Sequence, residues 1–217
     1  MVIKPKYLFS VIFLKSLLFC LFISGCGTQK KATKNTFSNE ESALILKVDS
    51  TLPMRVYKIN NKQDSLLLRT KSSYIKPNPN DQVLKHFVNR LYKTVRDSMS
   101  LGVGIAAPQV GILKNIIWVQ RFDKENFPFE VYFNPVIVEY SEQKQTFKEG
   151  CLSIPDRTET LNNRAYSIKL TYDTMDGIEK NETVEGFTSV IFQHEIDHLN
   201  GILYLDHLKK EIKESSN

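Results

Sequence analysis

The sequence contains few of the residues that cross-link proteins or bind metals, with three cysteines and four histidines among 217 residues. Two of the cysteines, Cys20 and Cys26, lie near the N-terminus. If that segment is processed as argued below, Cys151 is the only thiol left for the folded part, and an intramolecular disulfide is excluded. A lone thiol in an exported protein is buried and inert, reactive, or bound to a ligand such as a metal ion.

The sequence also lacks the features of nucleic-acid-binding proteins and of repeat proteins. It has no basic helix, no aromatic-studded strand with flanking arginines and no internal repeat. We therefore expect no nucleic-acid partner. The hydrophobic content of 41% and the charged content of 24% are ordinary for a globular fold, and the length suits one domain with a tail.

The first 25 residues have the composition of an export signal rather than of a folded element. Basic residues precede an apolar run at 17–23, and small residues, Ser24 and Gly25, follow it directly before Cys26. A cysteine after Ser-Gly resembles the lipobox of bacterial lipoproteins, in which that cysteine is lipidated. An uncleaved membrane anchor is the alternative, but the apolar stretch is interrupted by Lys15 and is at the lower length limit for a span.

The rest of the chain divides into a polar tether and one domain. Residues 26–43 are predicted to be a flexible tether, and residues 44–217 a catalytic domain. Weak alternation predicts short strands within 44–70, and apolar spacing predicts a helix from about Asp81 to Met99. β-Branched and aromatic residues predict strands at 116–119, 130–133, 136–140, 166–172 and 178–184, with Pro135 at an edge or bulge. The predicted fold is α+β, with antiparallel β-sheets packed around a central metal-binding helix.

That helix is predicted from the pattern His194-Glu195-Ile196-Asp197-His198. Residues four apart on a helix lie one above the other, so both imidazoles can bind one divalent cation, with Glu195 beside its open position. That carboxylate can accept a proton from water that the cation acidifies. Two unrelated surface histidines are the alternative, but apolar residues at helical spacing (Val190, Ile191 and Ile202) place both on the buried face.

Two further blocks precede this helix. The first, Gly102-Val103-Gly104-Ile105-Ala106-Ala107-Pro108-Gln109, has glycines that allow a close backbone approach, and it lacks the Lys-Ser/Thr of a phosphate loop. The second, Glu149-Gly150-Cys151-Leu152-Ser153, holds the lone cysteine. In this order the three blocks resemble the motifs GxGxAAxQ, EGCLS and HExxH of the peptide deformylase family, and the similarity extends over roughly residues 65–208.

The resemblance implies roles for individual residues. Cys151, His194 and His198 match the ligands of one divalent metal ion, usually Fe(II), although Zn, Ni or Co can occupy such a site. Glu195 matches the general acid/base, and the Gln109 side chain with the Leu152 backbone N–H matches the groups that stabilise the oxyanion. Four positions match contacts to the substrate: Gly104, and Val103, Val190 and Ile191 of the methionine pocket. Arg157 and Arg164 are both candidates for an arginine that meets the peptide.

Together, these features predict a monomeric metallohydrolase that converts small N-formylmethionyl peptides to formate and a free amine. The export signal places it in the cell envelope, anchored to the membrane through lipid on Cys26 and facing the periplasm or the exterior. One alternative is a non-catalytic lipoprotein that captures formylated peptides. The other is an HExxH zinc peptidase, which would need a third histidine where the chain has Tyr204, or a downstream glutamate, Glu211 or Glu214.

Overall fold

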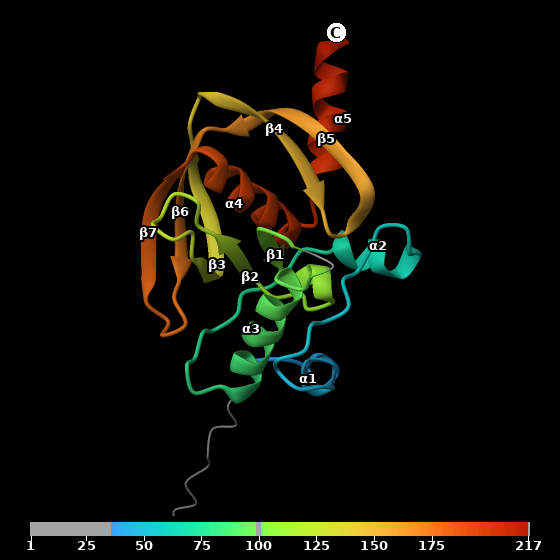
Figure 1. The fold of residues 1–217 in the computed structure, drawn as a ribbon, viewed down its shortest axis with the longest axis vertical. Coiled ribbons are helices and arrows are strands. Elements are labelled where there is room, and N and C mark those ends of the chain that lie inside the picture. Colours follow the sequence, from blue (N-terminus) through green and yellow to red (C-terminus); the bar gives the residue numbers. More distant parts are fainter. Residues whose placement is uncertain (1–35, 99–100, 217) are drawn as a thin grey trace, which may run out of the picture. The chain divides into compact units, whose positions relative to one another are not determined.

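The computed structural model describes residues 36–98 and 101–216 (Figure 1). The predicted signal, the lipidation site Cys26 and most of the predicted tether lie outside these residues. The described part is an α+β fold, as predicted from the sequence. None of its helices combines the length and apolar character needed to cross a bilayer.

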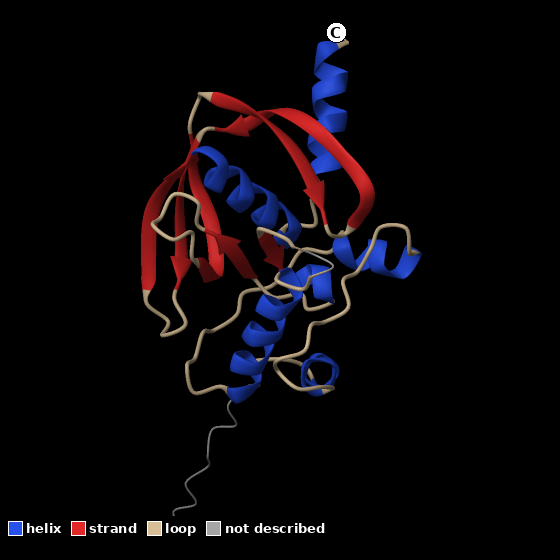
Figure 2. Cartoon of the chain, viewed as in Figure 1, coloured by secondary structure: helices blue, strands red, loops and turns tan. Residues whose placement is uncertain are grey.

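Two antiparallel sheets surround one helix. The larger sheet has the order β1-β2-β3-β6-β7, formed by Gly104–Ala106, Ile116–Gln120, Phe129–Tyr140, Ser167–Asp173 and Glu179–Glu185. The smaller is a hairpin of β4 (Lys144–Cys151) and β5 (Ile154–Ala165). Helix α4 (Gly186–Leu199) runs between the large sheet and this hairpin (Figures 1 and 2). This places the histidine helix at the centre of the fold, as predicted.

The predicted strands form β2, β3, β6 and β7, and one of the bulges in β3 lies at Pro135. The register of β3 against β6 shifts between Phe133 and Val136, where Asn134 has a φ of 50° and Pro135 follows. A proline has no N–H to donate to the ladder, so the bulge removes a pairing that Pro135 cannot make. Of the two positions predicted for Pro135, an edge or a bulge, the structure has the bulge.

The prediction of short strands within 44–70 is wrong. This region forms helices α1 (Asn39–Leu46) and α2 (Lys62–Leu68). Ser38 caps α1 in a capping box with Glu41, and the Asn61 side chain accepts from two backbone N–H groups of α2. These caps satisfy N–H groups of the first helical turn that have no partner within the helix.

The folded body also begins earlier than the predicted boundary at residue 44. Phe37 is 3% exposed, and its ring packs edge-on against Phe87 at a centroid distance of 5.7 Å. Thr36 donates a hydrogen bond to Asp81, the N-cap of α3 (Gln82–Val95), at 2.7 Å. The last part of the predicted tether is therefore packed, because one aromatic side chain in a polar segment finds a place in the core.

The histidine helix ends at Leu199, two residues before Gly201. Gly201 has a φ of 72°, which ends the helix in the left-handed conformation that glycine tolerates. Ile202 therefore lies beyond the helix and is 36% exposed, contrary to its predicted place on the buried face. The chain continues as helix α5 (Tyr204–Ser215), whose first residues pack with Ile154 and Leu161 of β5.

Candidate metal centre and catalytic cleft

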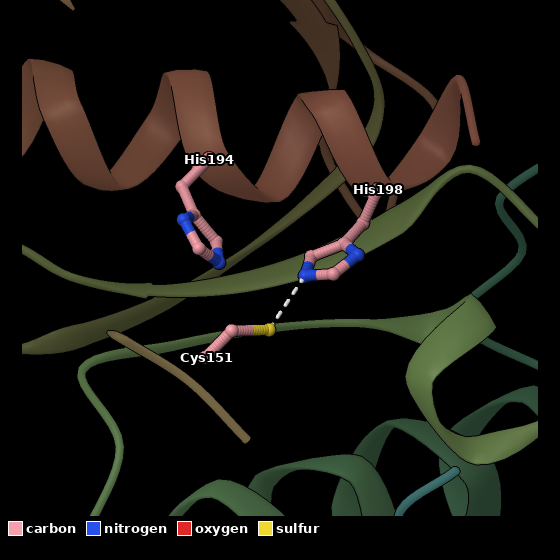
Figure 3. Close-up of side chains that lie close together, drawn as sticks. All are labelled: Cys151, His194 and His198. Carbon is pink, nitrogen blue, oxygen red and sulfur yellow. Dashed lines mark hydrogen bonds between the residues drawn. The ribbon is translucent and has the colours of Figure 1, made fainter. Parts of the chain in front are cut away.

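Three potential metal ligands converge between α4 and the β4–β5 hairpin. His194 and His198 are one turn apart on α4, and their ring centroids are 5.1 Å apart. Cys151 is the last residue of β4, and its Sγ lies 3.1 Å from Nε2 of His198 (Figure 3). One donor atom from each of the three residues lies within 4.8 Å of the others. The structure thus brings together the three residues that the sequence singled out.

The charges of this group favour a thiolate. Burial alone would raise the pKa of the Cys151 thiol, but the neighbouring imidazoles of His198 and His194 lower that pKa well below its usual range. A deprotonated thiol is the form that binds metals.

Glu149 on β4 orients the first histidine. Its Oε2 lies 2.8 Å from Nδ1 of His194, which leaves Nε2 of that ring for the site. Burial opposes ionisation of Glu149, but His194 and Arg164 lower its pKa to about 2. A carboxylate bound to the far nitrogen of a ligating histidine fixes its tautomer and ring orientation. No role was predicted for Glu149 from the sequence, although Glu149 is the first residue of the block that holds Cys151.

Arg164 on β5 supports this carboxylate and does not line the cleft described below. It donates two hydrogen bonds to Glu149, at 2.7 and 2.9 Å, and one to Asp197 at 2.7 Å. Its side chain is 3% exposed and its donors are committed to these two carboxylates. Of the two candidate arginines, Arg157 lines the cleft described below and Arg164 does not.

Glu195 lies beside the three potential metal ligands, and one of its carboxyl oxygens has no hydrogen-bond partner among the described residues. The residue is 4% exposed, and Oε2 makes no hydrogen bond within the described residues. Burial raises the pKa of Glu195 to about 7. A buried carboxyl oxygen without a partner is costly. The unpaired Oε2 of Glu195 is explained if a water or substrate atom binds to it during the reaction.

The side chain of Gln109 is held with its amide donor toward the site. Its Oε1 accepts a hydrogen bond from the backbone N–H of Ala106 at 2.8 Å, which fixes the orientation of the amide. Its Nε2 lies 3.5 Å from Sγ of Cys151 and 3.2 Å from Oγ of Ser153. The donor end of Gln109 therefore faces the group of potential ligands.

These residues form the floor of a cleft of about 710 Å³. Cys151, His194, Glu195, Gln109 and Leu152 all line it, and so do the four predicted substrate contacts, Val103, Gly104, Val190 and Ile191. Its apolar wall continues into two side chains that the sequence analysis missed, Phe147 and Phe187, whose rings stack at a centroid distance of 4.5 Å. No local motif marks them, because β4 and α4 bring them together from 40 residues apart.

The donor set fits a single divalent ion. Tetrahedral coordination by sulfur at about 2.3 Å and nitrogen at about 2.0–2.1 Å places ligand atoms roughly 3.3–3.6 Å apart. The observed spacing, 3.1 Å for the closest pair and at most 4.8 Å overall, needs only small side-chain movements to reach this geometry. A thiolate and two imidazoles are ligands that Zn and Fe(II) both accept.

The ligand sets of HExxH peptidases are not assembled here. Tyr204 occupies the place of the third histidine and offers no imidazole. Glu211 accepts a hydrogen bond from the backbone of Asn162 at 2.9 Å, and Glu214 lies 3.8 Å from Lys210, its neighbour on α5. Neither glutamate belongs to the group of potential ligands.

Comparisons with known proteins find relatives that match most of this chain. A family model for polypeptide deformylase matches residues 54–214. A peptide deformylase from Prochlorococcus marinus (strain NATL2A) is 34% identical over 202 residues, which cover 88% of this chain and 94% of the relative. One from Brucella suis biovar 1 (strain 1330) is 36% identical over 132 residues, which cover 60% of this chain and 73% of the relative.

Solved structures show the same likeness. The crystal structure of a class I type b peptide deformylase from Acinetobacter baumannii bound to Met-Ala-Ser superposes with a TM-score of 0.62 at 32% identity. The alignment covers 72% of this chain and 99% of that chain.

Proposed function

The chain belongs to the peptide deformylase family, hydrolases that act on N-formylmethionyl peptides, and on that premise we propose how its residues perform the reaction. The single metal ion of the family is held by Cys151, His194 and His198. The observation that carries this proposal is that these three side chains converge, and that Cys151 and His194 line one cleft together with Glu195 and Gln109.

The bound ion supplies Lewis acidity, which acidifies a water molecule and polarises the formyl carbonyl. Glu195 accepts the proton of the attacking water and passes it to the nitrogen of the leaving amine when the C–N bond breaks. The amide of Gln109 and the backbone N–H of Leu152 donate to the carbonyl oxygen as negative charge develops on it. Water and the formamide thus give formate and a free N-terminal amine.

We propose that the cleft holds the methionyl side chain against its apolar wall, with Val103, Val190 and Ile191 as contacts. Phe147 and Phe187 extend this wall. Thioether sulfur makes favourable contacts with aromatic rings, which suits methionine. Gly104 brings its backbone close to the substrate, and Arg157 lies in the same cleft, where it is the remaining candidate for peptide contact.

The experiment that tests this function compares turnover of formyl-Met-Ala with acetyl-Met-Ala, in air and anaerobically, with metal analysis of each preparation. We expect hydrolysis of the formyl peptide only. We propose Fe(II) as the physiological ion, so activity should be highest in anaerobic, iron-loaded protein. Glu195→Gln should abolish turnover and retain the metal. A metal-loaded wild-type protein that binds formyl-Met-Ala and does not hydrolyse it would instead be a capture protein.

We also propose that the enzyme is a monomer tethered to the membrane outside the cytoplasm through lipid on Cys26. The support is the sequence of the first 26 residues. The packed body begins at Thr36, so the chain between Cys26 and Thr36 would reach at most about 35 Å when fully extended. Its substrates would then be short exported formyl-methionyl peptides. A radioactive fatty acid should label the wild-type chain and leave Cys26→Ala unlabelled; equal label in both would refute lipidation at this residue.

A further inference from the structure

Helix α5 begins beside the metal centre, and its first turn contacts one proposed ligand directly. The ring of Tyr204 lies nearly parallel to the imidazole of His194, with centroids 5.9 Å apart and an interplanar angle of 24°. Tyr204 is 1% exposed, and its hydroxyl donates to the carbonyl of Arg157 at 3.0 Å. The ring is therefore held on both sides, by the helix that carries it and by strand β5.

His207, three residues later, contacts the same ligand through a chain of hydrogen bonds. Residues three apart lie on the same side of a helix. Nε2 of His207 lies 2.8 Å from Oδ2 of Asp197, the same oxygen that accepts from Arg164 at 2.7 Å. Arg164 donates to both oxygens of Glu149, and Glu149 binds Nδ1 of His194. The path from α5 to the ligand is continuous.

The geometry of this hydrogen-bond path makes the position of Glu149 sensitive to His207, which lies at the outer end of the path. Asp197 receives two contacts on one oxygen, so without His207 its carboxylate is held by Arg164 alone and can rotate. The guanidinium of Arg164 is a planar fork, so a change at its Asp197 side also tilts the two donors that face Glu149. The side chains of Arg164 and Glu149 are 3% and 4% exposed, so the bonds between them are shielded from water, whereas Asp197 at the outer end is 17% exposed.

We propose that the first turn of α5 is a positioning element for His194. Tyr204 supports the face of its imidazole, and His207 fixes, through Asp197 and Arg164, the Glu149 carboxylate that sets its tautomer. The inference rests on the proposed role of His194 as a metal ligand. Both residues lie outside the HExxH pattern, and the sequence marked Tyr204 only as the place of a missing third histidine.

The test measures how fast the full chain, loaded with Co(II), releases its ion into excess EDTA at 25 °C, followed by the visible absorption of the bound ion. His207→Leu removes the donor to Asp197, and His207→Gln keeps an amide donor at a similar reach. Loss of a direct partner of a ligating histidine costs about 10–100-fold in metal affinity. His207 acts at a distance, so we expect His207→Leu to release Co(II) about threefold to tenfold faster and His207→Gln within about twofold of wild type.

A second pair of variants separates the two contacts of Tyr204. Tyr204→Phe keeps the ring on His194 and loses only the bond to Arg157, so release should stay at the wild-type rate. Tyr204→Leu removes the ring, and release should be faster. The control is His86→Leu, because His86 is a half-buried residue of α3 that bonds to the carbonyl of Val48, away from α4.

Thermal unfolding of each metal-free variant, measured alongside, distinguishes positioning from a general loss of stability. A structural role would lower the melting temperature of His207→Leu and His207→Gln together without separating their release rates. Release at the wild-type rate from both His207→Leu and Tyr204→Leu would overturn the inference. Failure of the wild-type chain to bind Co(II) would overturn the proposed metal site first, and the inference with it.

Discussion

The carboxylate of Glu195 lies directly against the backbone of Gly104. A β-carbon built on Gly104 would be 2.5 Å from Oε1 of Glu195 and 2.8 Å from Cγ2 of Ile191. Real β-carbons do not approach other atoms this closely, so only glycine allows strand β1 to lie at this distance from helix α4. Glycine is therefore needed at position 104, the second glycine of the first block, because any side chain there would collide with the proposed acid/base, Glu195.

Gly104→Ala should therefore displace the Glu195 carboxylate and leave the three potential ligands in place. A misplacement of about 1 Å at a reacting group can cost about 100-fold in rate. We expect kcat for formyl-Met-Ala to fall by about that factor, with the metal content unchanged. Steady-state kinetics and metal analysis of one preparation check both parts. A wild-type kcat in this variant would show that Glu195 has room to move without loss of function.

Gln109→Glu tests whether the amide donor of Gln109 is what the reaction needs. The substituted side chain can still accept from the backbone of Ala106, so the local fold should remain. It cannot donate to a developing oxyanion when ionised. Removal of one such donor costs about 10²–10³ in kcat, and we expect a loss in this range. An unchanged kcat would assign oxyanion stabilisation to other groups.

Glu149→Gln should weaken both metal binding and the fold. The neutral amide binds His194 less strongly and leaves Arg164 with one carboxylate partner, Asp197. We expect a metal affinity about tenfold lower. The free energy of unfolding should fall by about 3 kcal/mol, because breaking a buried ion pair leaves a charge without its partner.

Metal titration and urea unfolding measure the two effects of Glu149→Gln. The matched control is Glu142→Gln, because Glu142 is exposed in the turn before β4 and should affect neither. Equal behaviour of the two variants would show that Glu149 is not needed to hold His194.

Asp64 should make the fold sensitive to acid. Hydrogen bonds from Arg55, at 2.7 and 2.9 Å, lower the pKa of Asp64 below its usual value. Because the folded-state pKa lies below the unfolded value of about 3.9, the charged pair stabilises the fold above that pH. This contribution is lost as the pH falls through the folded-state pKa.

Asp64→Asn should therefore lower stability at pH 7 and reduce its dependence on pH between about 5 and 2. Arg55 is 62% exposed, so water screens the pair and the effect should be about 1 kcal/mol. Urea unfolding over a pH series measures it, with the exposed Glu125→Gln as control. If the two variants lose stability in parallel as the pH falls, Asp64 is not the acid-sensitive group.

Much of the fold could be predicted from local patterns. The helix beginning after Asp81, the turn at Gly177 between β6 and β7, and the bulge at Pro135 each depend on residues close together in the chain. The helices at 39–46 and 62–68 could also have been found, because their caps, Ser38 and Asn61, are local. In these two segments, the capping residues indicate structure better than the weak alternation of apolar residues does.

The sequence by itself determined the chemistry of the site, because His194, Glu195 and His198 share one helical turn and the lone Cys151 sits in a recognisable block. Only the tertiary structure decided what holds these groups in place. Glu149 and Arg164 are not partners in the register of the β4–β5 hairpin but meet through their side chains, and Tyr204 reaches His194 because Gly201 turns the chain back. Such contacts depend on how whole elements pack, which local spacing does not encode.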